Sequence, residues 1–270
     1  MLVLYNIGMK FSLLTYNVLY NQAFQQLPKL IKNHKPDVVC LQEIDTKTQN
    51  LMLLENHGYR LADYSNSFFK FGTIYGIATF YNNKTLSLTN SNALILPRSI
   101  YELFLTVLRF LRGGNKPRTL LQTDFIMKNN KKKISVYNTH LTTICANGVR
   151  IKQIKEALDL NRINHQKNAA IITGDFNYFP YGRKQLEEIM EKYQFAEATK
   201  KIAYTIQFSS DGQFNTYHFI QKLVAKVFSK LFTDKLKIDY IYYKKLKHIE
   251  TKRVDIRFPD HYPIIAYFSG

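Results

Sequence analysis

Four apolar segments of this chain end abruptly in polar residues, and this feature constrains the fold more than any other. The clearest of them runs from Ile171 to Asn177, where an apolar stretch stops at a carboxylate and a carboxamide. The other three segments are Asp37 to Glu43, Ile134 to His140, and Phe258 to Pro263. A buried strand that ends in this way delivers its polar side chains to one rim of a sheet. We therefore predict one site that is shared by four strand ends.

The remaining segments predict a mixture of sheet strands and outer helices. Period-two or continuous apolar patterns predict strands over residues 11–17, 37–42, 59–64, 76–81, 86–96, 119–127, 133–139, 237–243, 246–254 and 262–268, with a further strand before Asp175. Helical spacing of apolar residues predicts helices over residues 23–33, 51–56, 149–163 and 185–193. Strand 37–42 is apolar on both faces, which places it centrally in a sheet. Strands that follow one another through turns predict antiparallel pairing.

This pattern predicts an α/β fold, a four-layer sandwich in which two mainly antiparallel mixed sheets pack face to face with helices outside. With no Pro/Gly/Ser-rich linker, residues 9–270 are expected to form a single domain, and residues 1–8 a dispensable N-terminal extension.

The charge of the chain predicts a polyanionic partner. Lys and Arg number 38 against 20 acidic residues, a net charge of +18, which attracts nucleic acid or an anionic membrane. A lysine-rich composition without functional meaning is the alternative. The two cysteines exclude a disulfide framework and a Cys-based zinc site, and indicate a reducing compartment, the cytoplasm. We find no signal peptide and no apolar run long enough for a spanning helix.

Two segments do not fit a plain scaffold. Residues 99–112 form a helix-length run that is apolar nearly all round and ends in Gly113-Gly114. Residues 217–232 combine an apolar stripe with Lys222, Lys226 and Lys230 on the opposite face. An ordinary surface helix explains the second segment, whereas a helix lying on an anionic membrane or substrate is the rival interpretation.

The polar strand ends have the chemistry of a divalent metal site. Carboxylate and carboxamide oxygens suit a hard cation such as Mg²⁺, with Mn²⁺ as the alternative. Glu43 and Asp260 supply charge, and Asn17 can orient or ligate without adding more. Histidines beside carboxylates are suited to proton transfer near neutral pH.

Six motifs in order resemble those of the endonuclease/exonuclease/phosphatase superfamily. They are Thr15-Tyr16-Asn17-Val18, Leu41-Gln42-Glu43, Asn138-Thr139-His140-Leu141, Gly174-Asp175-Phe176-Asn177, Ile238-Asp239-Tyr240 and Asp260-His261-Tyr262-Pro263. The superfamily includes pancreatic-type deoxyribonuclease, apurinic endonucleases, deadenylases, neutral sphingomyelinases and inositol polyphosphate 5-phosphatases. The resemblance spans residues 11–268 and implies a divalent-metal-dependent hydrolase that cleaves phosphodiester bonds.

The resemblance also implies metal and water-activating roles. Glu43 would be the principal metal ligand, with Asn17 beside it and Asp260 close to the same or a second cation. Asp175 would orient or deprotonate the attacking water, and Asn177 would hydrogen-bond the phosphoryl oxygens.

Two histidines complete the implied site. His261, held by Asp239, would contact the phosphate, while His140 would protonate the leaving oxygen. In the same resemblance, Arg118 would correspond to a phosphate-facing arginine. The chain departs from the family pattern at Pro259, where a serine commonly precedes the Asp-His pair, so one hydrogen bond of the site is in question.

The motifs leave the substrate open. A nuclease acting on the nucleic-acid backbone is favoured by the net charge. A sphingomyelinase-like phospholipid phosphodiesterase at a membrane surface is favoured by residues 99–112 and 217–232. A phosphomonoesterase acting on inositol phosphates is a further alternative, although the chain has no motif that we can assign to inositol recognition. A non-enzymatic scaffold is disfavoured because every catalytic position is filled.

Overall fold

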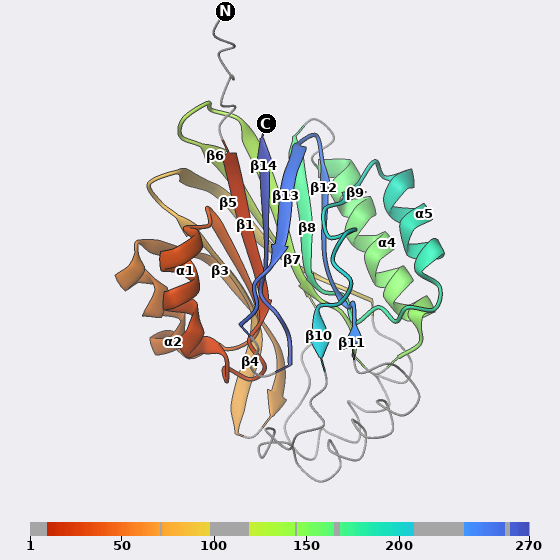
Figure 1. Cartoon of the computed structure of the whole chain (residues 1–270), viewed down its shortest axis with the longest axis horizontal. Coiled ribbons are helices and arrows are strands. Elements are labelled where there is room, and N and C mark those ends of the chain that lie inside the picture. Colours follow the sequence, from red (N-terminus) through yellow and green to blue (C-terminus); the bar gives the residue numbers. More distant parts are fainter. Residues whose placement is uncertain are drawn as a thin grey trace, which may run out of the picture.

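The strands of the computed structural model form two large sheets that face each other (Figure 1). The structure describes residues 10–70, 72–97, 119–143, 145–164, 168–207, 235–256 and 260–269. In spatial order, the first sheet contains β13 (Lys247–Arg253), β14 (Ile264–Ser269), β1 (Lys10–Asn17), β2 (Val38–Asp45), β4 (Thr73–Asn82) and β3 (Tyr59–Lys70). The second contains β5 (Leu86–Ile95), β6 (Thr119–Met127), β7 (Lys133–His140), β8 (Ala169–Asp175), β12 (Asp239–Lys244) and β9 (Ala196–Glu197).

Each sheet combines one parallel pair with antiparallel neighbours. The parallel pairs are β1 with β2 and β7 with β8, and the other pairings within the two sheets are antiparallel. A separate antiparallel ribbon joins β10 (Ile206–Gln207) to β11 (Lys235–Leu236). The predicted mixed, mainly antiparallel sheets are therefore confirmed.

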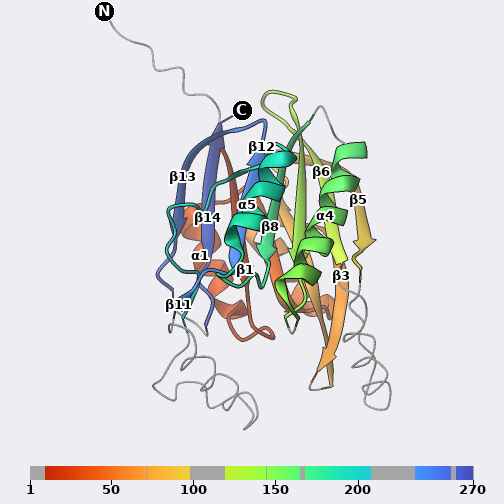
Figure 2. The same ribbon diagram turned by 90° about the vertical axis from the view of Figure 1, so that its right-hand side faces the viewer.

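Helices cover the outer faces of both sheets and complete the four predicted layers. On one side lie α1 (Leu27–His34) and α2 (Thr48–Met52), which are flanked by 3-10 turns at Phe24–Gln26 and Leu53–His57. On the other side lie α4 (Asn147–Asn164) and α5 (Arg183–Lys192) (Figure 2). Helix α1 buries Leu27, Leu30 and Ile31, which share one helical face. No helix in the described part of the chain has the length and apolarity needed to cross a membrane.

The layer between the sheets changes from apolar to polar along the same strands. Because side chains alternate between faces, every second residue of a strand points into this layer. Its apolar half consists of Phe11, Leu13, Val38, Cys40, Ile134, Val136, Ile171 and Ile241. Its polar half consists of Asn17, Gln42, Asn138, His140, Asp175 and Asp239, two or four residues farther along β1, β2, β7 and β8 and at the start of antiparallel β12. The start of β1 and the end of β14 lie near the apolar half, and β10 and β11 lie at the opposite end (Figure 1).

The structure corrects three details of the sequence prediction. Strands β4 and β5 follow one another through a turn but lie in different sheets, so they are not an antiparallel pair. The three tail strands are likewise divided, since β12 belongs to the second sheet and β13 and β14 to the first. Strand 37–42 does not end before Glu43 but continues to Asp45 through a bulge. An apolar pattern shows which face of a strand is buried. Because both sheets bury a face in the same layer, the pattern does not show to which sheet a strand belongs.

Several predicted features lie outside the described residues. These are the extension 1–8, the segments 99–112 and 217–232, Arg118 and Pro259.

Candidate active site

Three predicted site residues lie side by side at the edge of the second sheet. Asp175 ends β8 and is the register partner of both His140 on β7 and Asp239 on β12. Nε2 of His140 lies 3.5 Å from Oδ2 of Asp175. All three side chains are buried. Adjacent strand ends therefore place two carboxylates and an imidazole together, away from bulk water.

Gly174 permits this close approach of β7 and β8. Its φ is +132°, and a Cβ at this position would lie 1.9 Å from the carbonyl oxygen of Thr139. A side chain here would collide with backbone, so only glycine fits the position. This steric requirement explains why a glycine precedes Asp175 in the sequence motif.

Asn17 connects the first sheet to Asp175. Its Nδ2 donates to Oδ2 of Asp175 at 3.0 Å, and its Oδ1 accepts from the backbone N–H of Leu19 at 3.0 Å. Asn17 is buried at the end of β1. With both polar atoms of the amide engaged, the carboxamide is fixed and in turn orients the carboxylate.

Glu43 enters the site from a β-bulge. The pairing of β2 with β4 shifts between Gln42 and Ile44, and Glu43 adopts a φ of +56°. A bulge re-aims a side chain, and a left-handed non-glycine residue costs roughly 1–2 kcal/mol. Oε1 of Glu43 lies 3.7 Å from Nε2 of His140. The local strain therefore accompanies the delivery of this carboxylate to the site.

His261 and Asp239 form a buried ion pair. Nδ1 of the imidazole lies 2.9 Å and 3.1 Å from the two carboxylate oxygens, and Nε2 lies 3.9 Å from Oδ2 of Asp175. Burial alone would lower the pKa of His261, but the charges of Asp239, Asp260 and Asp175 raise it well above its ordinary value of 6.5. This shift favours the charged form of the imidazole.

Asp175 lies in an excess of negative charge. Burial, assisted by the carboxylates of Asp239 and Glu43, raises the pKa of Asp175 to about 7, against the lowering effect of His261 and of a hydrogen bond from the Asn177 backbone. A carboxyl group with such a pKa exchanges its proton close to neutral pH.

The last two predicted residues join the same group of contacts. The backbone N–H of Asn177 donates to Oδ1 of Asp175 at 2.8 Å, and its Nδ2 donates to the carbonyl oxygen of Leu141 at 3.2 Å. Oδ1 of Asp260 accepts from the backbone N–H of His261 at 2.9 Å. Seven of the predicted residues are thus linked by direct contacts, Asp260 adjoins them as the chain neighbour of His261, and Arg118 lies outside the described residues.

Comparison with known proteins agrees with this geometry. The model of the Endonuclease/Exonuclease/phosphatase family matches residues 14–260, which include every predicted site residue except His261. The chain belongs to this family.

Similar proteins include an exoribonuclease subunit and a 2',3'-cyclic phosphatase. The CCR4-Not complex 3'-5'-exoribonuclease subunit Ccr4 of Candida albicans is 27% identical over 90% of this chain, which spans only 36% of that protein's length. The human Nocturnin catalytic domain with bound sulfate has a TM-score of 0.69 at 19% identity, covering 96% of this chain and 93% of that one. ANGEL2, a 2',3'-cyclic phosphatase in complex with adenosine-2',3'-vanadate, has a TM-score of 0.68 at 17% identity, covering 96% and 95%. These two structural likenesses establish the shared fold.

Two motif residues without a predicted role tie the sheets of this family member together. Nε2 of Gln42 donates to Oδ1 of Asn138 at 2.8 Å, across the layer between the sheets. Nδ2 of Asn138 donates back to the carbonyl oxygens of Leu41 and Ala78 at 3.2 Å and 3.0 Å. The only hint in the sequence was that each motif places a carboxamide side chain, Gln42 or Asn138, within an apolar strand. The sequence does not reveal that they face one another.

Thr205 was missed altogether, although it links the segments that carry Asp239 and His261. Its Oγ1 accepts from the backbone N–H groups of Ile238 and Asp239, both at 3.0 Å. Its own N–H donates to the carbonyl oxygen of Leu236, and its carbonyl oxygen accepts from the N–H of Tyr262. Thr205 is fully buried, so these bonds have no competition from water.

The donor set of this site fits a divalent cation. Oxygen donors from Glu43, Asp175, Asp239 and Asp260 are buried beside two imidazoles, and the raised pKa of Asp175 reflects its burial among other carboxylates. Ligand atoms of Asp175, Asp239 and His261 lie within 4.8 Å of one another. Hard oxygen ligands of this kind favour Mg²⁺ or Mn²⁺.

Proposed function

We propose that this chain is a Mg²⁺-dependent phosphodiesterase that hydrolyses the backbone of nucleic acid. The observation that carries the proposal is the buried contact group at Asp175, in which carboxylates, a carboxamide and two histidines from both sheets meet. Such a group combines a base, a cation and hydrogen-bond donors, as phosphodiester hydrolysis requires.

Asp175 is proposed to accept the proton of the attacking water. Its pKa of about 7 leaves a large fraction ionised at neutral pH while keeping useful basicity. Asn17 holds one carboxylate oxygen and the Asn177 backbone the other, so the base has one orientation.

The developing negative charge of the phosphoryl group would be stabilised by His261 and Asn177. The imidazolium of His261, kept charged and oriented by Asp239, presents Nε2 toward Asp175. The amide of Asn177 now donates to Leu141, and we propose that it exchanges this contact for a phosphoryl oxygen. His140 is proposed to protonate the leaving oxygen.

Glu43, Asn17 and Asp260 are the proposed ligands of the cation, with Mn²⁺ as the alternative to Mg²⁺. Bound there, a divalent cation would supply Lewis-acid stabilisation of the phosphoryl oxygens. Glu43 is one of the carboxylates that surround Asp175, which supports a cation at this site.

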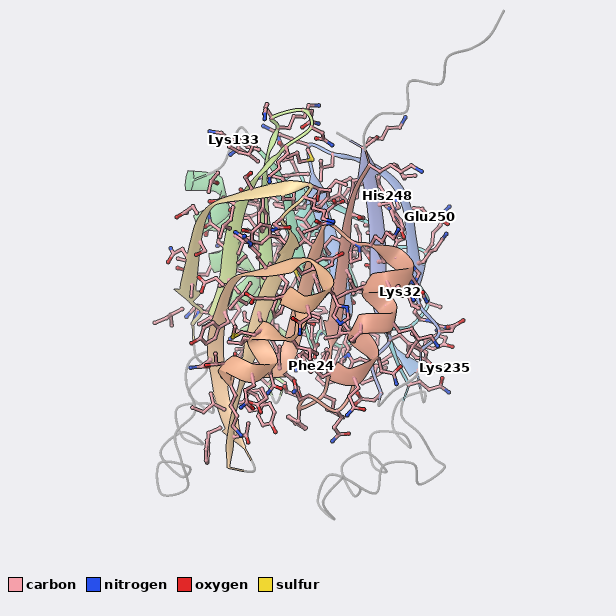
Figure 3. The ribbon with its side chains drawn as sticks, turned by 90° about the vertical axis from the view of Figure 1, so that its left-hand side faces the viewer. Phe24, Lys32, Lys133, Lys235, His248 and Glu250 are labelled. Atoms are coloured by element: carbon pink, nitrogen blue, oxygen red, sulfur yellow. The ribbon has the colours of Figure 1, made fainter. Side chains whose placement is uncertain are left out.

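Nucleic acid is the proposed substrate because the positive net charge and the similarity to an exoribonuclease subunit both favour it. The chain has a net charge of +18, and among the described residues Lys32, Lys133 and Lys235 are exposed on separate parts of the surface (Figure 3). Lysines placed in this way neutralise backbone phosphates. The relative from Candida albicans is named as an exoribonuclease subunit. The cytoplasmic location stays a prediction, consistent with the free thiols of Cys40 and Cys145.

The sphingomyelinase-like alternative depends on residues 99–112 and 217–232, which lie outside the described part of the chain. It therefore stays a prediction.

The test is a Mg²⁺-dependent hydrolysis panel with wild type and Asp175→Asn. Substrates are single- and double-stranded DNA, RNA, sphingomyelin vesicles and inositol phosphates. Cleavage of nucleic acid by the wild type alone, decreasing steeply with salt, is the expected result. Cleavage of lipid or inositol phosphate alone would overturn the nuclease proposal, and full activity of Asp175→Asn would overturn the site assignment.

A further inference from the structure

A column of three stacked side chains stands beside the candidate active site. The guanidinium carbon of Arg150 on α4 lies 4.5 Å from the ring centroid of Phe179. The ring of Phe179 stacks with that of Tyr181, with centroids 5.7 Å apart and planes 14° from parallel. Arg150 is fully buried, Phe179 is half-buried and Tyr181 is 55% exposed. The column therefore begins in the core and ends in a flat aromatic surface open to solvent.

Asn147 fixes the loop that carries both aromatic residues. Its Oδ1 accepts from the backbone N–H of Phe179 at 3.2 Å, and its Nδ2 donates to the carbonyl oxygens of Phe179 at 3.2 Å and Tyr181 at 2.5 Å. Oδ1 also accepts from Arg150 at 3.0 Å. One buried carboxamide thus holds the loop backbone and the base of the column.

Arg150 connects this column to the loop after His140. Its Nε donates to the carbonyl oxygen of Thr142 at 2.9 Å and its NH2 to that of Thr143 at 2.6 Å. Burial lowers the pKa of Arg150, against the raising effects of Cys145 and Asp175. The buried end of the column is therefore held by the loop that follows His140.

Tyr181 lies on the loop that continues from Asn177. Four residues of chain span at most about 14 Å, which limits the separation of their Cα atoms. A polymer bound with a phosphate at Asn177 would therefore have its neighbouring nucleotides within reach of the tyrosine ring.

We propose that the exposed face of Tyr181 stacks on an unpaired nucleobase next to the scissile phosphate, and so selects single-stranded nucleic acid. This inference rests on the proposed nuclease function. A base is the ligand whose shape completes the column, since it is flat, aromatic and carried by a polyanion that the +18 chain attracts. Paired bases within a duplex keep their faces covered and cannot extend the stack.

Isolated exposed aromatic residues are common and need no ligand. Tyr181 differs because its ring orientation is set from beneath by Phe179 and its loop by Asn147. A stacking surface that is already ordered loses little conformational entropy when a base binds.

The test measures oligonucleotide binding in the Asp175→Asn background, which prevents cleavage. Adding Tyr181→Ala should weaken binding of a single-stranded oligonucleotide about 5- to 150-fold, the range of one base–aromatic stack. Tyr181→Phe should keep affinity within about twofold, because the stacking ring remains. Tyr64→Ala removes another exposed tyrosine, 41% accessible, and serves as the matched control with no expected change.

A series of oligonucleotides, each lacking one base, locates the contact. At one position, removal of the base should weaken binding to the protein that keeps Tyr181. For that oligonucleotide, the two proteins, with and without Tyr181, should then have the same affinity. If the proteins with and without Tyr181 bind every oligonucleotide of the series equally well, and wild type still cleaves nucleic acid, the stacking proposal alone is overturned. Absence of both cleavage and binding by wild type would overturn the nuclease proposal with it. Should Tyr181→Ala unfold, the single-base series on the protein that keeps Tyr181 still decides the matter.

Discussion

The two halves of the layer between the sheets are built on the same strands and have opposite composition. On β8, Ile171 belongs to the apolar half and Asp175 to the polar half. On β7, Ile134 and Val136 precede Asn138 and His140. The apolar half removes hydrocarbon from water and stabilises the fold. The polar half buries carboxylates at a cost that hydrogen bonds across the sheets offset in part. The comparison indicates that one half holds the sheets together so that the other can hold charge.

The largest expected effect comes from breaking the polar half at Asp175. Asp175→Asn should lower kcat about 10³-fold, in the range of general-base loss, because the amide cannot accept the water's proton. Steady-state hydrolysis of an oligonucleotide measures it, with circular dichroism to verify folding. A kcat within tenfold of wild type would exclude Asp175 as the base.

The matched change in the apolar half is Ile171→Ala on the same strand. Removing this fully buried side chain should lower the free energy of unfolding by about 2–5 kcal/mol, from lost burial and the cavity left behind. Urea unfolding measures it. The kcat of the folded fraction should stay within about twofold, and a kcat loss as large as that of Asp175→Asn would mean that the halves are not separable.

Thr205→Val should have an intermediate effect on both properties. The valine cannot accept the N–H groups of Ile238 and Asp239, and leaving these buried donors unsatisfied costs about 1–3 kcal/mol. We expect kcat to fall more than tenfold because the Asp239–His261 pair loses its support. Thr205→Ser keeps the hydroxyl and should restore kcat, whereas equal activity of all three proteins would assign Thr205 a purely structural role.

The smallest effect, taken per pH unit, is a pH dependence of stability in metal-free protein. The raised pKa of Asp175 means that the folded state binds the extra proton between about pH 4 and pH 7, so stability should fall as pH rises through this window. The slope is at most about 1.4 kcal/mol per pH unit. The raised pKa of His261 acts in the same direction, because its stabilisation is lost as pH rises through the folded-state value.

The Asp175→Asn variant isolates the first contribution. Unfolding in EDTA from pH 4 to pH 8 should show a wild-type stability that declines relative to the variant. A constant difference between the two proteins would show that Asp175 has an ordinary pKa.

Sequence patterns predicted the sheets, the helices and a site shared by polar strand ends, for reasons visible in the structure, and the family resemblance supplied the individual site residues. Period-two apolar runs that stop at Asn17, His140 and Asp175 report strands whose inner face changes from core to site. The bulge at Glu43 could not be predicted, since it arises from the pairing of β2 with β4. The Gln42–Asn138 bridge and the role of Thr205 depend on which strands oppose one another, which is a property of tertiary structure. The transition between sheets after β4 is hidden for the same reason, because strands of both sheets bury a face in one layer.

The most direct measurement follows hydrolysis and unfolding temperature together while Mg²⁺ is added back to protein treated with EDTA. The buried carboxylates of the polar half should make the metal-free protein inactive and less stable at pH 8. Activity on single-stranded nucleic acid and the unfolding temperature should then rise over the same Mg²⁺ concentrations, with both responses weakened in Glu43→Gln. Hydrolysis that is unaffected by EDTA, or an unfolding temperature that does not respond to Mg²⁺, would contradict the proposal that the polar half is built to hold a divalent cation for catalysis.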